Sequence, residues 1–236
     1  MSFDARVGRG NHPASVFRCG LVISATPELP AVSEQADRLV ELGVHRLAGW
    51  SATRLRAAAE TAVGAGPLLA LHPDLVPVSL LAPLLNLDGK PGFVVVDMAD
   101  VDEFSPTMEP PDTPVYAVDG LDRGDAMSNW SPAEADPAIA AAGRTPLTLT
   151  EGLYWLLQRP ETLERGRCFM TIGSRRHRPG GGLDARTPAI WISNGTGRDG
   201  ADRRGAPKVG WCWAGNRHTW LGFASAAGRR PVGVLR

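Results

Sequence analysis

The spacing of apolar residues changes near residue 165, and this change constrains the fold more than any other feature of the sequence. Before it, apolar side chains recur mostly at the three- and four-residue spacing of amphipathic helices, with a few short apolar runs typical of strands. After it come four short segments rich in aromatic and β-branched residues, namely RCFMTIGS, PAIWISN, KVGWCWA and TWLGFAS. Helices and some parallel strands followed by an antiparallel sheet predict an α+β fold.

The chain is expected to form a single α+β domain over residues 28–236. Residues 1–27 lack a sustained apolar period and predict an extended or poorly ordered arm. The domain divides into a helical hairpin lobe (28–66), an α/β part (67–164) and a basic antiparallel sheet that ends in a β-hairpin (165–236).

Capping residues predict where helices begin. Ser33, Ser51 and Thr150 each precede a helical apolar pattern, and Pro160 lies near the end of the last of these helices or kinks it. The segment SPAE at 131–134 is a capping box, with Ser as the N-cap, Pro at the first helical position and Glu three residues after the cap. A helix is therefore predicted from this Ser to about residue 142.

Short apolar runs predict three strands in the α/β part. They are PLLALHP, VYAVDG and GFVVVDM at 92–98, and the last is expected to be fully buried. An acidic, proline-containing loop follows residue 98.

The two final strand segments predict a hairpin. KVGWCWA and TWLGFAS are separated by GNRH, which places Asn216, Arg217 and His218 at the turn. Strand alternation then puts Trp211 and Trp213 on one face of the sheet and the intervening cysteine on the other.

Charge is distributed unevenly although the net charge is zero. Residues 1–164 contain 11 basic and 22 acidic side chains, whereas residues 165–236 contain 14 basic and 3 acidic ones. Two interpretations stay open: the two parts neutralise each other, or the basic part faces an anionic ligand.

The last third also gathers indole, guanidinium and imidazole groups. Aromatic faces beside positive charge suit a planar anionic ligand, because the ring stacks and the charge pairs. The expected ligand-binding residues are Arg198, Lys208, Trp211, Trp213, Asn216, Arg217 and Trp220. If the protein has turnover, Cys212 and His218 form the nucleophilic pair, and nearby arginines are expected to lower the thiol pKa. This hypothesis requires Arg198, Arg217 and His218 to line one pocket.

Two further motifs lack part of the structural context that their usual functions require. GTGRDG at 195–200 matches GxGxxG, but the following Gly and Pro leave no room for the helix that a dinucleotide fold requires. Its backbone N–H groups and Arg198 are still suited to a phosphate or carboxylate. The spacings of Cys168, His177, Cys212 and His218 match no zinc motif, so no metal ligand and no cofactor is assigned.

Several segments resemble a known family. They are NWSPAEA, GRTPLTLTEGL, RCFMTIGSR, PAIWIS and above all APKVGWCWAGNRHTWLGFASAAGR. Over roughly residues 28–230 the chain resembles a family of uncharacterised actinobacterial proteins, domain of unknown function five-seven-zero-one. The resemblance implies kinship with single-domain proteins and brings no activity, cofactor or catalytic residue.

Together these patterns predict a cytoplasmic protein that binds a small anionic or aromatic molecule on its C-terminal sheet, for example as an enzyme of specialised metabolism. The sequence contains no run of 18 apolar residues, so no membrane-spanning helix is predicted. Two alternatives are a nucleic-acid-associated accessory protein and a non-catalytic partner that docks a basic neighbour through its acidic loop.

Overall fold

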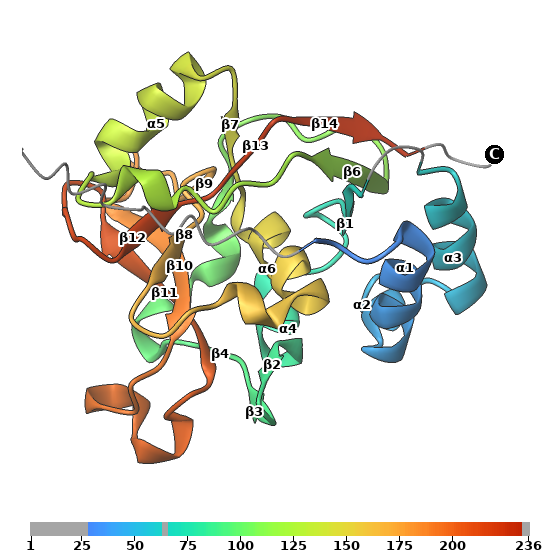
Figure 1. Ribbon diagram of the computed structural model, residues 1–236, viewed down its shortest axis with the longest axis horizontal. Helices are drawn as coiled ribbons and strands as arrows, with labels where there is room; N and C mark the ends of the chain where they lie inside the picture. The colour runs from blue at the N-terminus through green and yellow to red at the C-terminus, as the bar shows by residue number, and fades with distance from the viewer. Residues whose placement is uncertain (1–27, 63–65, 233–236) are drawn as a thin grey trace, which may run out of the picture.

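The structure is a computed structural model that describes residues 28–62 and 66–232. It confirms the α+β class, with helices at the ends and between two main sheets (Figure 1). The predicted N-terminal arm, residues 1–27, lies outside the described residues. No helix in the described part is long and apolar enough to cross a bilayer.

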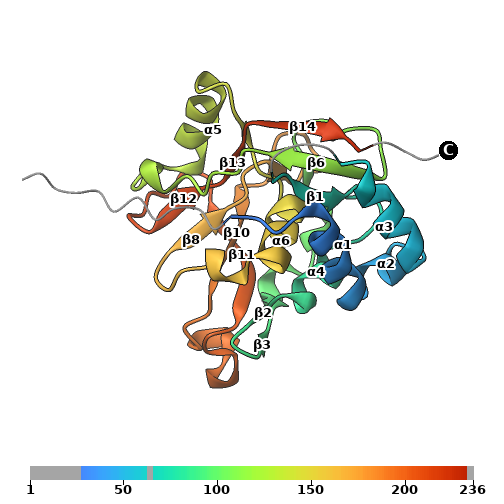
Figure 2. The same ribbon diagram turned by 45° about the vertical axis from the view of Figure 1, so that its right-hand side comes forward.

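Three short helices form the N-terminal lobe at one end of the molecule (Figures 1 and 2). They are α1 (Val32–Glu41), α2 (Val44–Leu47) and α3 (Ala52–Glu60). The predicted cap of α3 is confirmed, because the N–H of Arg54 donates to Ser51 Oγ at 3.1 Å. The predicted cap of α1 is wrong: the N-cap is Ala31, whose N–H donates to the Glu34 carboxylate at 3.1 Å.

A three-stranded antiparallel sheet lies next to this lobe. Its order is β1 (Leu68–Leu71), β6 (Val115–Asp119) and β14 (Gly228–Pro231), and the first two strands were predicted. Between β1 and β6 the chain forms α4 (Val78–Leu81) and several short elements. These are β2 (Asn86–Leu87), β3 (Lys90–Pro91), β5 (Ser105–Pro106) and 3₁₀ turns at Ala82–Leu84, Val96–Met98 and Val101–Glu103.

A five-stranded sheet forms the other half of the molecule. Its order is β12 (Leu221–Phe223), β8 (Cys168–Met170), β10 (Arg186–Ile192), β11 (Pro207–Trp213) and β4 (Phe93–Val94). The antiparallel pairing is confirmed for β8, β10 and β11. The two edge strands β12 and β4 pair in parallel with their neighbours.

The predicted terminal hairpin is wrong, although both of its strands are present. β12 pairs with β8, so β8 and β10 lie between β11 and β12. The connection across the end of the sheet is held by the first turn of the helix α5 (Pro132–Ala141) and by the segment before that helix. The N–H of Ala133 donates to Ala214 O at 3.1 Å, and the N–H of Asn129 donates to His218 O at 3.0 Å. The position beside β8 also buries Leu221 and Phe223.

The predicted buried strand at 92–98 is also wrong in most of its length. Only Phe93 and Val94 pair with β11, and the chain then turns into a 3₁₀ helix in which Val96 is 61% exposed. The last backbone bond to β11 runs from the N–H of Val95 to Val209 O at 2.9 Å. The apolar run is thus a strand end followed by a turn.

Two helices cover opposite faces of the five-stranded sheet. α6 (Leu149–Gln158) packs on the inner face, which we define by Phe169, Ile190 and Val209, and Trp155 meets Phe169 edge-on at 5.2 Å. α5 (Pro132–Ala141) covers part of the outer face, which we define by Cys168, Met170 and Ala189. The faces follow from strand alternation.

The caps of these helices agree in part with the predictions. The capping box of α5 is confirmed, with the N–H of Ser131 donating to Glu134 at 2.9 Å. The N-cap of α6 is Thr148 instead of the predicted Thr150. Pro160 follows the end of α6, as expected.

A buried ion pair joins α6 to the three-stranded sheet. The side chains of Arg229 on β14 and Glu151 on α6 are 3% and 0% exposed, and Nε lies 2.5 Å from Oε1. The hydroxyl of Tyr116 donates to the same carboxylate at 3.1 Å. Burial, followed by the adjacent Glu151 charge, raises the pKa of Tyr116 well above its usual range.

The remaining elements tie the sheets together. β7 (Thr145–Pro146) pairs with β13 (Ser225–Ala226), and β9 (Ser174–Arg175) pairs with β5. Further 3₁₀ turns lie at Asp125–Met127, Pro160–Thr162, Gly197–Asp199 and Ala201–Arg203.

Candidate functional site

The outer face of the five-stranded sheet contains a pocket beside the part that α5 covers. Its volume is about 430 Å³, and we call it the aromatic pocket. Its lining includes Cys168, Trp191, Asn194, Cys212, His218 and Trp220. Trp211 also lines it.

Trp191 takes its position because its cross-strand neighbours leave room for the indole. A Cβ atom on Gly210 would lie only 2.6 Å from Cη2 of Trp191, so glycine lets the ring lie against β11. Lys208 is the register partner of Trp191, and its Nζ lies 4.8 Å from the ring centroid. The ammonium therefore contacts the ring by a cation–π interaction.

The connection between β11 and β12 contributes a second aromatic element. The rings of His218 and Trp220 stack with centroids 4.4 Å apart and an interplanar angle of 12°. Trp220 is 51% exposed, which is unusual for an indole of a folded domain. The stack offers an open aromatic surface next to the pocket.

The two thiols of the pocket are protonated at neutral pH. Burial raises the pKa of Cys168 to about 12. Burial also raises the pKa of Cys212, against the opposing effect of a hydrogen bond with Asn216. The expectation that arginines lower this pKa is therefore wrong. Cys212 and His218 line the same pocket, but this thiol is not prepared as a thiolate nucleophile.

A second hollow, which we call the polar pocket, has a volume of about 310 Å³. Its charged and hydroxyl side chains are Asp97, Thr196, Arg198, Asp199, Arg203 and Lys208. Nζ of Lys208 lies 2.8 Å from Asp199, and the hydroxyl of Ser193 donates to the same carboxylate at 2.7 Å. Burial opposes ionisation of Asp199, but these two contacts hold its pKa below the usual range.

Arg217 lines a third hollow, separate from the aromatic and polar pockets. It pairs with Glu134 of α5 and lines a hollow of about 610 Å³ together with Trp130. Arg198, Arg217 and His218 thus line three different pockets, and the expectation that they share one is wrong. The absent hairpin explains this result, because the 214–220 connection leaves β11 for the opposite edge of the sheet.

The two tryptophans of β11 do share a face, as predicted. The ring centroids of Trp211 and Trp213 are 4.5 Å apart, and Trp213 is 47% exposed. Alternation places both side chains on the inner side of the sheet, where Trp211 packs against the main core, although Trp211 also borders the aromatic pocket. Sequence reasoning did not select Trp191 and Cys168; the alternating pattern of PAIWISN and RCFMTIGS could have found them once the strand order was known.

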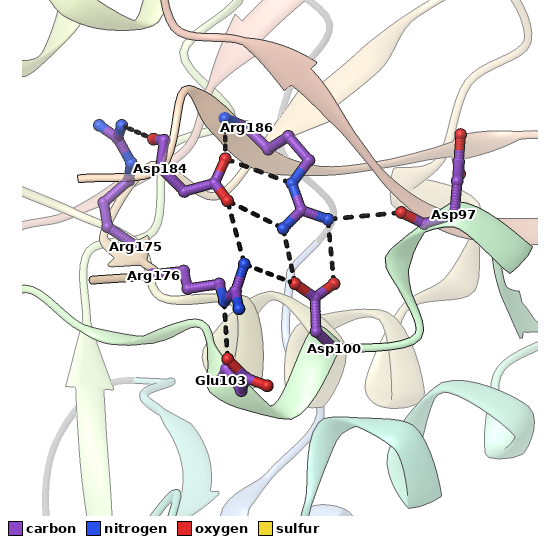
Figure 3. Close-up of polar contacts among 7 residues, drawn as sticks. All are labelled: Asp97, Asp100, Glu103, Arg175, Arg176, Asp184 and Arg186. Atoms are coloured by element: carbon purple, nitrogen blue, oxygen red, sulfur yellow. Dashed lines mark hydrogen bonds and ion pairs between the residues drawn. The ribbon is translucent and has the colours of Figure 1, made fainter. Parts of the chain in front are cut away.

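A network of ion pairs joins the acidic loop after residue 96 to β10 and to the segment before it (Figure 3). Of its residues, Asp97 lines the polar pocket. Arg186 binds both carboxylate oxygens of Asp100, at 2.9 and 2.6 Å, and also contacts Asp184 at 2.9 Å. Arg176 reaches Asp100 at 3.0 Å and Glu103 at 2.7 Å. Hydrogen bonds from Arg186 hold the pKa values of Asp100 and Asp184 below their ordinary range.

Ion pairs between the basic last third and the acidic first part offset much of the charge asymmetry. Arginines after residue 165 pair with carboxylates before it: Arg176, Arg186, Arg198, Arg217, Arg229 and Arg230. These contacts favour mutual neutralisation of the two parts. Asp97, Asp100 and Glu103 of the acidic loop thus pair with arginines of the same chain.

Metal binding has no assembled ligand set in the described part of the chain. Within residues 28–62 and 66–232, no group of three or more His, Cys, Asp or Glu side chains is placed to hold an ion. Of the four residues considered for zinc, Cys168, Cys212 and His218 line the aromatic pocket, but they are not placed to hold an ion together.

Residues 38–232 match the model of a family described as "Family of unknown function (DUF5701)". No curated protein and no solved structure matches the chain. The family match covers the lobe from the second half of α1 onward, both main sheets and every residue of the aromatic and polar pockets.

Proposed function

The chain belongs to the family of unknown function DUF5701, and we propose that it binds a planar aromatic small molecule in the aromatic pocket. One observation carries the proposal: a hollow of about 430 Å³ lined by Trp191 and by the stacked His218 and Trp220. Its volume is in the range of small-molecule sites.

The chemistry of the lining suits a flat, mostly apolar ligand. Indole and imidazole faces stack on aromatic rings, which stabilises such pairs by roughly 0.5–1.5 kcal/mol beyond the burial of area. The protonated thiols of Cys168 and Cys212 behave as small apolar groups. The amide of Asn194 provides a polar contact that orients a ligand.

The same observations support binding over the other functions that the sequence left open. Protonated thiols favour a binding role for Cys212 and His218 over nucleophilic catalysis. A nucleic-acid surface needs a continuous basic stripe, whereas the arginines named above pair with carboxylates. Binding of a small aromatic molecule therefore has the best physical support.

A matched pair of tryptophan variants tests the proposal. We expect neutral planar probes, indole and 2-naphthol, to bind wild-type protein in ligand-observed NMR titrations. Trp220→Ala should weaken binding about fivefold, equivalent to an aromatic contact of about 1 kcal/mol. Trp213→Ala is the control, because this indole is 47% exposed but does not line the pocket.

Two results would overturn the proposal. One is that neither probe binds wild-type protein at millimolar concentration. The other is that Trp213→Ala weakens binding as much as Trp220→Ala. Thermal unfolding of each ligand-free variant shows whether its fold is intact.

A further inference from the structure

The aromatic and polar pockets share a wall. Trp191 lines the first and Lys208 lines the second, and the two residues are register partners on β10 and β11. The Lys208 ammonium lies 4.8 Å from the centroid of the indole. After β10, Asn194 lines the aromatic pocket and Thr196, two residues later, lines the polar one. A single ligand can therefore reach from one hollow into the other across this pair.

The polar pocket has an excess of positive charge. Its three cations face two carboxylates, and Lys208 is neutralised by Asp199 at 2.8 Å. The side chain of Arg198 is 75% exposed, and its Nη1 lies 3.5 Å from Asp97 Oδ2. Such an exposed ion pair is weak. Among the described residues, Arg203 makes no ion pair at contact distance, although its charge, after the contacts from Lys208 and Ser193, also helps to lower the pKa of Asp199. One positive charge is thus left for an external anion.

Arg203 is also held in place before any ligand arrives. Its guanidinium carbon lies 4.3 Å from the centroid of Phe93 on β4, so the planar group rests on the ring. A guanidinium that is already oriented loses less rotamer freedom when it binds an anion. Such a group presents paired N–H donors, which fit a carboxylate or phosphate. The hydroxyl of Thr196 adds a donor at the same pocket.

We propose that the ligand of the aromatic pocket is an aromatic acid, whose ring stacks there and whose anionic group, on a flexible tail, is held in the polar pocket by Arg203 and Arg198. The inference rests on the proposed function, because the ring must occupy the first hollow for the tail to reach the second. It adds the class of ligand and the residues that recognise its charge.

Matched pairs of probes test the role of the anion. Flavin mononucleotide and riboflavin differ by a phosphate, and indole-3-butyrate and indole-3-butyramide differ by a carboxylate. We expect Arg203→Gln to weaken binding of the anionic member of a pair about tenfold, since one charge-assisted interaction is lost. The neutral member should change less than twofold. The pair with the larger dependence on Arg203 identifies the anion.

Control variants separate the inference from the proposed function. Arg178→Gln removes the same charge from an exposed loop residue that lines neither hollow, and it should leave both members unchanged. Trp220→Ala should weaken both members of a pair. If Trp220→Ala acts in this way but Arg203→Gln affects neither member, or both equally, the aromatic-acid inference is wrong while the proposed function survives. If Trp220→Ala affects no probe, both are wrong.

Discussion

The inner and outer faces of the five-stranded sheet are made by alternate residues of the same strands, yet they differ in what they do. On the inner face, Phe169, Ile190 and Val209 are fully buried under α6. On the outer face, α5 leaves Trp191 half-buried and Trp220 exposed beside a hollow. We therefore expect stability to depend mainly on the inner face, and the binding that we propose belongs to the outer one. The two faces should therefore respond differently to substitution.

The largest loss of stability is expected at the buried ion pair between α6, which packs on the inner face, and β14. Arg229→Ala leaves the Glu151 carboxylate without its cation at a site where the two side chains are 3% and 0% exposed. Breaking such a pair costs about 3–5 kcal/mol in the free energy of unfolding. Urea denaturation measures this loss. The neighbouring variant Arg230→Ala is the control, since its pair with Asp119 is about one-third exposed and should cost below about 1 kcal/mol. Equal losses would contradict the comparison.

A smaller loss of stability, together with a loss of binding, is expected for Gly210→Ala. The added Cβ meets Trp191 at 2.6 Å and Val95 at 3.2 Å, so the indole must move. Overpacking of this kind costs about 1–3 kcal/mol. Thermal unfolding and NMR titration with indole should both change. Gly215→Ala serves as the control, because an added Cβ there meets nothing within 4 Å. Unchanged binding in Gly210→Ala would argue against a positioned Trp191.

The ion-pair network of Figure 3 predicts a pH dependence. Arg186 holds the folded-state pKa values of Asp184 and Asp100 below the unfolded value of about 3.9. The stabilisation is present above that value and is lost as the pH falls through the folded-state pKa. Asp184→Asn should cost about 2 kcal/mol at pH 7 and less at pH 3, as measured by urea denaturation. Asp74→Asn, whose side chain is 87% exposed, should show no such difference.

The smallest expected effect is a difference in the labelling rates of the thiols on the outer face. With Cys19 replaced by Ser, iodoacetamide at pH 8 should modify native Cys168 far more slowly than the denatured protein, because the pKa of this thiol is about 12. A saturating aromatic probe should further slow modification of Cys212, which lines the aromatic pocket. Mass spectrometry of the peptides measures both rates. Fast labelling of Cys168 in the native state would contradict the buried outer-face contact.

Local signals in the sequence predicted much of the fold. The capping box at Ser131, the cap at Ser51 and the strand segments of the last third need only neighbouring residues, and the structure confirms them. The partner of the 219–225 strand was not predictable in this way, because pairing with β8 depends on residues about fifty positions away. The segment 92–98 was misjudged since an apolar run does not show where pairing with a distant strand stops.

The candidate site shows the same limit. Cys212, His218 and Trp220 were selected from the sequence and line one pocket. The charged residues were placed with them because a hairpin was assumed, and the actual strand order separates them. Trp191 joins the site through β10, whose position next to β8 only the sheet topology reveals.

The last three described strands belong to three different sheets, and this affects how the chain can fold during its synthesis. Within a few residues of each other, β12 completes the five-stranded sheet, β13 pairs with β7 and β14 closes the three-stranded sheet. A nascent chain that stops short of residue 221 lacks an edge of all three sheets and also the cation for Glu151. Folding of the whole domain must therefore wait until this stretch has left the ribosome, and the earlier part spends translation with open strand edges that attract chaperones.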